Sequence, residues 1–443
     1  MSRVSELALP RSIRWAIVVT VALRLAMLVV SPMKDEGAYE QLIIARNAVT
    51  GHGFDMAWPY WPNDAEREKI WQTDPTPHPS AFMPPFVPAF YAAVYAVTGP
   101  GATGIYVGLV IQCLVGGLIP LLVYRIARRL ATEKGSTWAA WASLLYLPGL
   151  LSSATPAGAI WYSVMALWVI DVAQQVYANQ GRAWLLGISL GLMALMRGEF
   201  LYIGLALAAV PLLQRRYAQT AVCLTCMAVT IAPWTIRNIV HLGEPVVIVS
   251  HPWREIWRGT NPRASGSGYD AEGWSIWEGE RFPHITTRLD SVPLTPAFEV
   301  EADKVFRDES LSFIREYPDR WLVLLAKKFA MLWTVDPYYP RGTNIAFVLP
   351  SLATSVMIII GAWMMVVSVR SSRTPIFSAI PITVIGLLLV AVFSLTYVQP
   401  RYQIYLFTAL FPLVALPLQT MPKMTRGFGF LRGSETDDRH LPV

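Results

Sequence analysis

Residues 375–397 read PIFSAIPITVIGLLLVAVFSLTY, and this stretch contains no charged side chain. An apolar run of about 20 residues is long enough for a helix to cross the hydrocarbon core of a bilayer. Because similar runs recur along the chain, we predict an all-α polytopic membrane protein with about 10 transmembrane helices, within a range of roughly 9–13. The predicted spans lie near 12–31, 102–126, 135–153, 156–178, 183–197, 199–214, 217–236, 345–370, 375–397 and 402–420.

The composition also indicates a membrane environment. Hydrophobic residues make up 54% of the 443-residue chain and charged residues only 15%, whereas soluble domains carry about 25% charged residues. The 17 Trp and 18 Tyr suit a protein with two membrane–water interfaces. The net charge of +6 does not indicate nucleic-acid binding, because the basic residues lie in short clusters between apolar spans rather than in one patch.

Basic residues set the predicted orientation, because short cytoplasmic connections are enriched in Lys and Arg. Here they fall in alternate short connections, all on one side if both termini are cytoplasmic. The basic clusters are Arg11 and Arg14, Arg125 to Arg129, Arg182, Arg215 and Arg216, Arg370 and Arg373, and Lys423 to Arg426. The predicted units are a cytoplasmic N-terminus (1–11), an N-terminal transmembrane module (12–236) with an outer loop (32–101), an outer loop region (237–344), C-terminal transmembrane helices (345–420) and a cytoplasmic tail (421–443).

The two outer loops are longer than a connection requires, and such loops usually have a task. We expect the first to contain an amphipathic helix near 36–50 and an apolar hairpin near 84–98, and the second a helix near 297–317. The apolar stretch 321–334 contains two lysines, and counting it as a crossing would move the next basic cluster to the outer side. We therefore predict that 321–334 is an interfacial helix lying flat on the membrane.

An acidic pair, Asp35 and Glu36, directly follows the first predicted span. Carboxylates are favoured at helix N-termini, so helix capping explains one of them. A carboxylate within hydrogen-bond reach of a hydroxyl can instead act as a general base, and the residues alone leave both readings open. Tyr39, Arg46 and His78 lie in the same outer loop and are candidate binding residues.

Arginines from three separated segments are predicted at the outer face: Arg197, Arg237 and Arg401. One such arginine would mean little, since anchoring side chains are common at a membrane boundary. Three arginines opposite an acidic pair indicate an anion site, because guanidinium groups are suited to phosphate. The neighbouring motifs add the candidate binding residues Glu199, Arg258 and Tyr402.

Four further residues could carry chemistry but are interpreted structurally. Arg24 and Asp171 are charges inside predicted spans, and we expect pairing or snorkelling for both. Cys223 and Cys226 match C-x-x-C, yet they lie in an apolar run and are read as small residues of a membrane helix.

The sequence contains no glycine-rich nucleotide motif and no convincing metal set. Asp64 with Glu66, and Asp270 with Glu272, are spaced acids in polar loops, where solvation is the commoner fate. We therefore predict no cofactor; a divalent metal is compatible with the sequence but has no support in it.

The order of these motifs resembles the C-type membrane glycosyltransferases, in particular the branch of the protein O-mannosyltransferases and lipid A aminoarabinose transferase. The resemblance covers roughly 12–415 and rests on motif order more than on any single motif. The motifs are, in order, Asp-Glu-x-x-Tyr, Ala-Arg-Asn, Gly-x-Gly-Phe, a Pro-Pro turn, Arg-Gly-Glu, Pro-Trp-x-x-Arg-Asn, Trp-x-Gly-x-Asn-Pro and a late Arg-Tyr.

The resemblance implies an inverting transferase in the bacterial inner membrane, with its active site facing the periplasm and 12–236 as the catalytic module. Its donor would be a polyprenyl-phosphate-linked sugar, and its acceptor an envelope glycan, a glycolipid or a protein. It implies that Asp35 is the catalytic carboxylate with Glu36 as its helper. It also implies phosphate contacts from Arg197, Arg237 and Tyr402 or Arg401.

One departure limits what the resemblance implies. The aminoarabinose transferase branch has a lysine before the Pro-Pro pair, where this chain has Met83. His78 and Lys69 are the candidate replacements, so the donor and acceptor of that branch are not carried over. A lipid flippase or transporter remains an alternative, although no paired repeat is visible and the unusual features cluster on one face. An assembly subunit without activity is a third reading.

Overall fold

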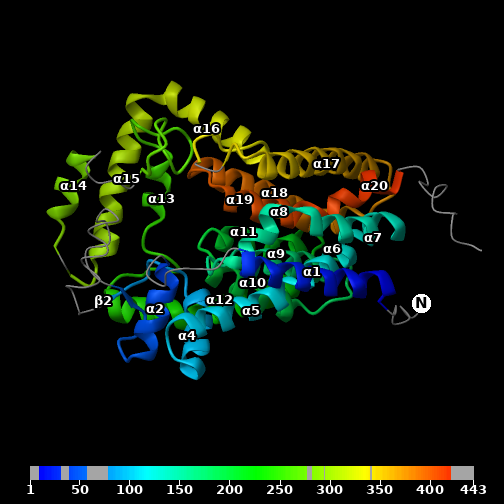
Figure 1. Ribbon diagram of the computed structural model, residues 1–443, viewed down its shortest axis with the longest axis horizontal. Helices are drawn as coiled ribbons and strands as arrows, with labels where there is room; N and C mark the ends of the chain where they lie inside the picture. The colour runs from blue at the N-terminus through cyan, green and yellow to red at the C-terminus, as the bar shows by residue number, and fades with distance from the viewer. Residues whose placement is uncertain are drawn as a thin grey trace, which may run out of the picture.

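The computed structural model describes residues 9–30, 39–56, 78–276, 282–293, 295–339 and 342–420, and within them the protein is almost entirely helical (Figure 1). The only sheet in this part of the chain is an antiparallel pair, β1 (Asp55–Met56) and β2 (His78–Pro79). Asp35 and Glu36, predicted as catalytic residues, lie outside the described residues, as do Asp64, Glu66 and Lys69.

Seven helical segments in the described ranges are long and apolar enough to cross a membrane, and the protein is an integral membrane protein. They are α1 (Arg11–Val30), α5 with α6 (Ala102–Gly116 and Leu118–Ala127), α9 (Ala159–Tyr177), α12 (Tyr217–Leu242), α17 (Ile345–Arg370), α18 (Ile376–Leu395) and α19 to α20 (Pro400–Leu410, Phe411–Val414 and Ala415–Thr420). Three shorter apolar helices accompany them: α4 (Phe86–Thr98), α10 (Ala183–Met196) and α11 (Phe200–Leu213). The all-α polytopic prediction is confirmed.

Two predicted elements are wrong in detail. The predicted span 135–153 is broken into α7 (Glu133–Ala142), a 3-10 turn (Ser143–Leu145), α8 (Leu147–Leu151) and a second 3-10 turn (Ser152–Ala154). The break lies at Tyr146, whose ψ of 86° is not helical, and Pro148 stands in the first turn of α8, where its missing N–H is tolerated. The predicted hairpin near 84–98 is instead a single helix, α4, which packs against α5.

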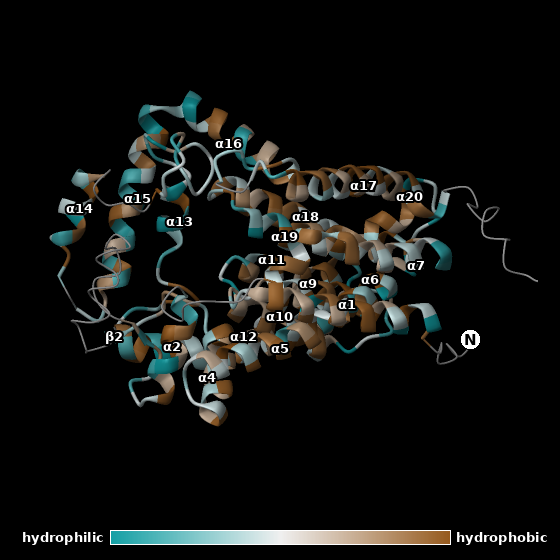
Figure 2. Ribbon diagram, in the orientation of Figure 1, coloured by the Kyte–Doolittle hydropathy of each residue, from teal (hydrophilic) through white to brown (hydrophobic). Residues whose placement is uncertain are grey.

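The helices of the two long loops lie together at the end of the bundle opposite the N-terminus, which we call the loop end (Figure 1). They are α2 (Glu40–Val49) from the first loop, and α13 (Pro252–Arg258), α14 (Pro283–Asp290) and α15 (Phe298–Glu316) from the second. Figure 2 shows α17 and α18 as mainly hydrophobic ribbons and α14 and α15 with many hydrophilic residues. The stretch predicted at 321–334 is helix α16 (Pro318–Trp333); that it lies flat at the interface stays a prediction.

Small residues let α10 pack closely on α12. A Cβ atom added to Gly187 would lie 2.4 Å from the carbonyl oxygen of Cys223, and one added to Gly191 would lie 2.6 Å from the Cβ of Thr230. Such close backbone approach is how membrane helices associate without a hydrophobic driving force between them. Cys223 and Cys226 are both free cysteines in α12, which agrees with their interpretation as small residues of a membrane helix.

The two charges inside spans have structural partners. Asp171 is fully buried and forms ion pairs with Arg125 at 2.9 Å and Arg129 at 2.7 Å. Arg24 donates instead to the carbonyl oxygen of Gly149 at 3.0 Å and the hydroxyl of Ser153 at 2.7 Å. Arg24 thus ties α1 to the broken segment 143–154, whose irregular backbone needs partners inside a membrane.

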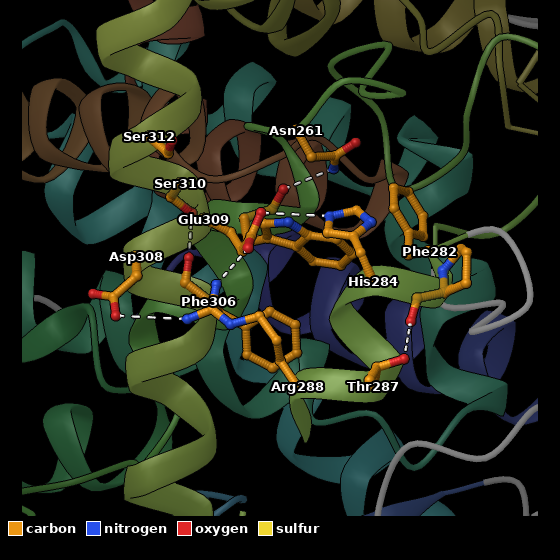
Figure 3. A network of polar contacts seen from close by, with 12 residues as sticks. Asn261, Phe282, His284, Thr287, Arg288, Phe306, Asp308, Glu309, Ser310 and Ser312 are labelled. Carbon is orange, nitrogen blue, oxygen red and sulfur yellow. Dashed lines mark hydrogen bonds and ion pairs between the residues drawn. The ribbon is translucent and has the colours of Figure 1, made fainter. Parts of the chain in front are cut away.

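The second long loop has its own small core. The Trp257 ring lies 4.9 Å from Phe282 and 5.1 Å from Phe306, and these rings join α13 to α15. Figure 3 shows the polar network beside this core, in which Glu309 contacts both His284 at 3.5 Å and Arg288 at 2.5 Å. The network fastens α14 to α15 and lies away from the cavity described below.

Candidate functional site

A cavity of about 720 Å³ opens at the loop end of the bundle. Its lining comes from segments far apart in the sequence, namely the start of α2, the α10–α11 turn, residues 245–258, the end of α18 and the start of α19. The lining includes the charged side chains Glu40, Arg197, Glu199, Arg254, Glu255, Arg258 and Arg401, together with the imidazole of His251. Apolar side chains such as Leu201, Val392 and Phe393 form part of the same wall, so the site combines a cationic region with an apolar one.

Arg197 is held by three aromatic rings and one carboxylate. The chain leaves α10 in an extended conformation at Arg197 and turns at once into α11, so its side chain projects at the helix end. Its guanidinium carbon lies 5.1 Å from the Tyr402 and Tyr405 ring centres and 5.5 Å from the Tyr162 ring centre. Glu199 accepts a hydrogen bond from it. Both side chains are less than one-fifth exposed, so the pair is only weakly screened by water.

Arg401 lies at the first turn of α19, after a proline that ends the preceding extended segment. Its guanidinium carbon is 5.5 Å from the ring of Tyr402, which itself stacks on Phe393 at 4.5 Å with an interplanar angle of 7°. Burial raises the pKa of the Tyr39 phenol, and the charge of Arg401 acts in the opposite direction. Tyr39 and Arg401 both line the cavity, although they lie near opposite ends of the sequence.

Helix α13 supplies the other basic side chains of the cavity. Arg258 lies 4.2 Å from the Tyr397 ring centre and donates a hydrogen bond to its hydroxyl. Arg254 lies 4.7 Å from the Phe82 ring centre, and His251 stacks on Phe82 at 3.8 Å. The helix is placed by Asp303 of α15, whose carboxylate accepts from the first backbone amides of α13, the arrangement expected of a helix N-terminal cap.

The charges around α13 determine two protonation states. Burial would raise the pKa of Glu255, but the charges of Arg258 and Arg254 help to hold it at about 2, so it is a carboxylate at neutral pH. Burial lowers the pKa of His251 to about 3, so its imidazole is neutral. The described lining of the cavity therefore contains four arginines and three glutamates. The acidic pair of the first loop is not part of this count.

The structure brings together six of the predicted site residues at the cavity wall, which are Tyr39, Arg197, Glu199, Arg258, Arg401 and Tyr402. Arg46 lies in the last turn of α2 and His78 in β2, and neither belongs to the described lining of the cavity. Asp35 follows α1 and precedes Tyr39 by four positions in the chain, but its own position lies outside the described residues.

Arg237 occupies a different environment from the one predicted for it. Helix α12 continues six residues beyond the predicted end at 236, so Arg237 is part of the helix. Its guanidinium donates to the carbonyl oxygens of Phe54 at 2.7 Å and Ser80 at 2.8 Å, and lies 3.6 Å from the Asp55 carboxylate. In this arrangement it fastens the first loop to α12 rather than lining the cavity.

Sequence reasoning missed several lining residues. Glu255 and Arg254 lie in the segment WREIWR (253–258), where charges among tryptophans could have attracted attention. The tyrosines around the arginines, Tyr162, Tyr397 and Tyr405, carry no such signal, because each lies in an ordinary apolar stretch.

No group of three or more His, Cys, Asp or Glu side chains in the described ranges is arranged to hold a metal ion. Asp270 and Glu272, one of the two acidic pairs considered above, contact Arg263 at 3.2 and 3.4 Å. Their charge is thus shared with a guanidinium.

No protein-family model and no curated protein matches this sequence. Among solved structures, one match is the archaeal oligosaccharyltransferase AglB from Archaeoglobus fulgidus, in complex with an inhibitory peptide and a dolichol-phosphate. The TM-score is 0.51 at 14% sequence identity, and the match covers 92% of this chain and 50% of the AglB chain. The apo oligosaccharyltransferase of the same organism matches with a TM-score of 0.52 at 12% identity, covering 91% and 50%. ArnT from Cupriavidus metallidurans bound to undecaprenyl phosphate has a TM-score of 0.40 at 15% identity, covering 91% and 78%.

This chain spans about half the length of the oligosaccharyltransferase structures that it matches. At such low identity the likeness concerns the fold, and it extends over nine-tenths of this chain. At the level of the fold, the resemblance predicted from the motifs is confirmed: the chain shares the fold of the Archaeoglobus fulgidus oligosaccharyltransferase.

Proposed function

We propose that this protein is an inverting glycosyltransferase that takes a sugar from a polyprenyl-phosphate carrier and transfers it at the outer face of the membrane. The observation that carries the proposal is the cavity itself, in which Arg197, Arg258 and Arg401 lie beside an apolar wall. A lipid phosphate has the matching chemistry, because guanidinium groups bind its oxygens while its hydrocarbon chain stays in the bilayer.

The fold supports the same conclusion. The oligosaccharyltransferase with which the chain shares its fold was determined with a dolichol-phosphate bound. The acceptor class is a glycan, a glycolipid or a protein of the cell envelope. The resemblance suggests a bacterial inner membrane, and the basic clusters of the short connections favour an orientation in which the cavity faces the periplasm.

The proposed reaction needs a base and a site for the leaving charge. The acceptor hydroxyl oxygen bonds to the anomeric carbon, and the bond from that carbon to the phosphate oxygen breaks. Asp35 takes the hydroxyl proton, with Glu36 beside it, and the electron pair leaves on the polyprenyl phosphate. The cavity arginines stabilise that phosphate, and the interaction with Arg197 is only weakly screened by water because its side chain is less than one-fifth exposed.

Asp35→Asn tests this assignment in purified full-length protein in lipid nanodiscs. The substrates are a panel of synthetic polyprenyl-phosphate sugars, and mass spectrometry follows the release of polyprenyl phosphate. We expect Asp35→Asn to slow release roughly a hundredfold or more, as for loss of a general base. Asp308→Asn is the matched control, because Asp308 is a half-exposed carboxylate on α15.

Two results would contradict the proposal. Full turnover by Asp35→Asn would reject Asp35 as the base. Absence of release by the unmodified protein, together with movement of labelled lipid across vesicles, would favour the flippase alternative. Lipid mass spectrometry of a deletion strain then identifies the donor, as a sugar-phosphate lipid that accumulates.

A further inference from the structure

Helix α16 carries a lysine on its buried face. The buried residues of this helix are Leu324, Lys328, Met331 and Leu332, so Lys328 occupies a position where an apolar side chain is expected. Its side chain is completely buried, whereas the adjacent Lys327 is exposed. A buried cation is costly unless it is well hydrogen-bonded, so the partners of Lys328 indicate its role.

Those partners are the backbone carbonyls at the end of α18. The Lys328 ammonium donates to the carbonyl oxygen of Thr396 at 2.8 Å and to that of Leu395 at 3.4 Å. The last carbonyls of a helix lack intrahelical partners and carry a partial negative charge. Among the described residues no carboxylate forms an ion pair with Lys328, and burial lowers its pKa to about 7. The end of α18 is therefore its binding partner.

The backbone around this contact is tightly packed. A Cβ atom added to Gly259, directly after α13, would lie 1.9 Å from the Thr396 carbonyl oxygen and 3.1 Å from the Lys328 ammonium. Real Cβ contacts are essentially never closer than 3.0 Å. Glycine at this position lets the end of α13 approach the Lys328–Thr396 hydrogen bond directly.

The turn that follows α18 delivers cavity side chains. Val398 is bridged to the segment 266–268, because its amide donates to Gly266 at 2.9 Å and its carbonyl accepts from Gly268 at 3.1 Å. Tyr397, on one side of Val398, accepts the hydrogen bond from Arg258. Arg401, three residues after Val398, lies in the first turn of α19.

We propose that Lys328 is a positioning residue for the anion site of the cavity. It holds the C-terminal carbonyls of α18 and thereby fixes the turn 396–399, which places Tyr397 and Arg401 at the cavity wall. The consequence for lipid binding rests on the proposed function. The consequence for the turn does not, so the experiment measures the two separately.

The experiment compares Lys328→Met with Lys327→Met in the full-length protein in nanodiscs. Hydrogen exchange followed by mass spectrometry reports on the peptide covering 395–402. We expect exchange of this peptide to rise about tenfold or more in Lys328→Met, because the turn, no longer held by its carbonyls, opens more often and exposes its amides to water. We expect no change in Lys327→Met. Affinity for undecaprenyl phosphate, the second readout, should fall about tenfold in Lys328→Met only.

Lys328→Arg keeps a donor and a charge, and it should restore part of both readouts. Unchanged exchange of 395–402 in Lys328→Met would overturn the proposal, as would exchange that rises equally along the whole chain. Equal results for the Met and Arg variants would also overturn it, because the hydrogen bonds would then not be what fixes the turn. If the unmodified protein does not bind undecaprenyl phosphate, the proposed function fails, and the exchange result alone decides the role of Lys328.

Discussion

Arg197 and Glu199 form the pair whose substitution tests the proposed anion site most directly. We expect Arg197→Met to weaken the binding of undecaprenyl phosphate. A hydrogen bond to a charged group contributes about 1.5–3 kcal/mol, which corresponds to a loss of roughly 10-fold to 150-fold in affinity. The loss should fall in the upper part of this range, because the variant also leaves the Glu199 carboxylate without its partner in a poorly screened site.

Glu199→Gln should act in the opposite direction. The Arg197 guanidinium is hydrogen-bonded to Glu199 and packed against Tyr162, Tyr402 and Tyr405. A lipid phosphate must compete with the carboxylate but not with the neutral rings. Removing the carboxylate charge should therefore improve affinity by up to about fivefold, the scale of an ion pair of about 1 kcal/mol. The double variant Arg197→Met with Glu199→Gln should bind better than Arg197→Met alone, since residues in direct contact are not additive.

The assay is native mass spectrometry of undecaprenyl phosphate bound to the protein in nanodiscs, with Arg182→Met as the matched control. Arg182 is also an arginine beside an aromatic ring, 6.0 Å from Trp184, but it is exposed and precedes α10, at the opposite end of that helix from Arg197. Unchanged affinity in Arg197→Met would refute the placement of the phosphate. A loss in Glu199→Gln as large as that in Arg197→Met would show that Glu199 contacts the ligand itself.

Two further predictions concern stability. Asp171→Asn should lower the free energy of unfolding by about 2–3 kcal/mol. This is somewhat less than the usual cost of breaking a buried ion pair, because Arg125 and Arg129 are partly exposed. An unchanged thermal midpoint in detergent would contradict the prediction. Burial raises the pKa of Asp303 to about 7 in the folded protein, whereas an aspartate in the unfolded chain has a pKa of about 3.9. The folded state therefore binds the proton more tightly. The stability that this binding contributes is complete at low pH and is lost as pH rises from about 4 through 7. Asp303→Asn should make the thermal midpoint depend less on pH across this range. An unaltered slope of thermal midpoint against pH would refute the assignment to Asp303.

The membrane spans could be predicted from sequence because a bilayer imposes one length and one polarity on every crossing helix. The same signal fails at Tyr146, where hydrophobicity continues but the backbone breaks, since the apolar count registers side chains and not backbone conformation. It also failed to distinguish the single helix α4 from a hairpin.

The cavity was predicted less completely, because sequence gives the order of residues but not the direction of side chains. Arg197 and Arg401 come together as expected, since each lies at a helix end on the loop side. Arg237 met the same criterion, yet its guanidinium points to the backbone of the first loop. The difference arises because α12 runs on through Arg237, and the helix rotation at that point fixes where the side chain points.

The aromatic partners of the arginines explain how the site can hold its cations without cancelling them. A carboxylate fixes a guanidinium but also neutralises it, as Glu199 does in part for Arg197. A ring fixes the guanidinium through its quadrupole and leaves the net charge unchanged. Arg401 on Tyr402 follows this second arrangement, whereas Arg258 packs on Tyr397 and its charge also acts on the Glu255 carboxylate. An anion site inside a membrane protein needs guanidinium groups that are held in place and keep their positive charge. A tyrosine ring holds a guanidinium in place without neutralising it.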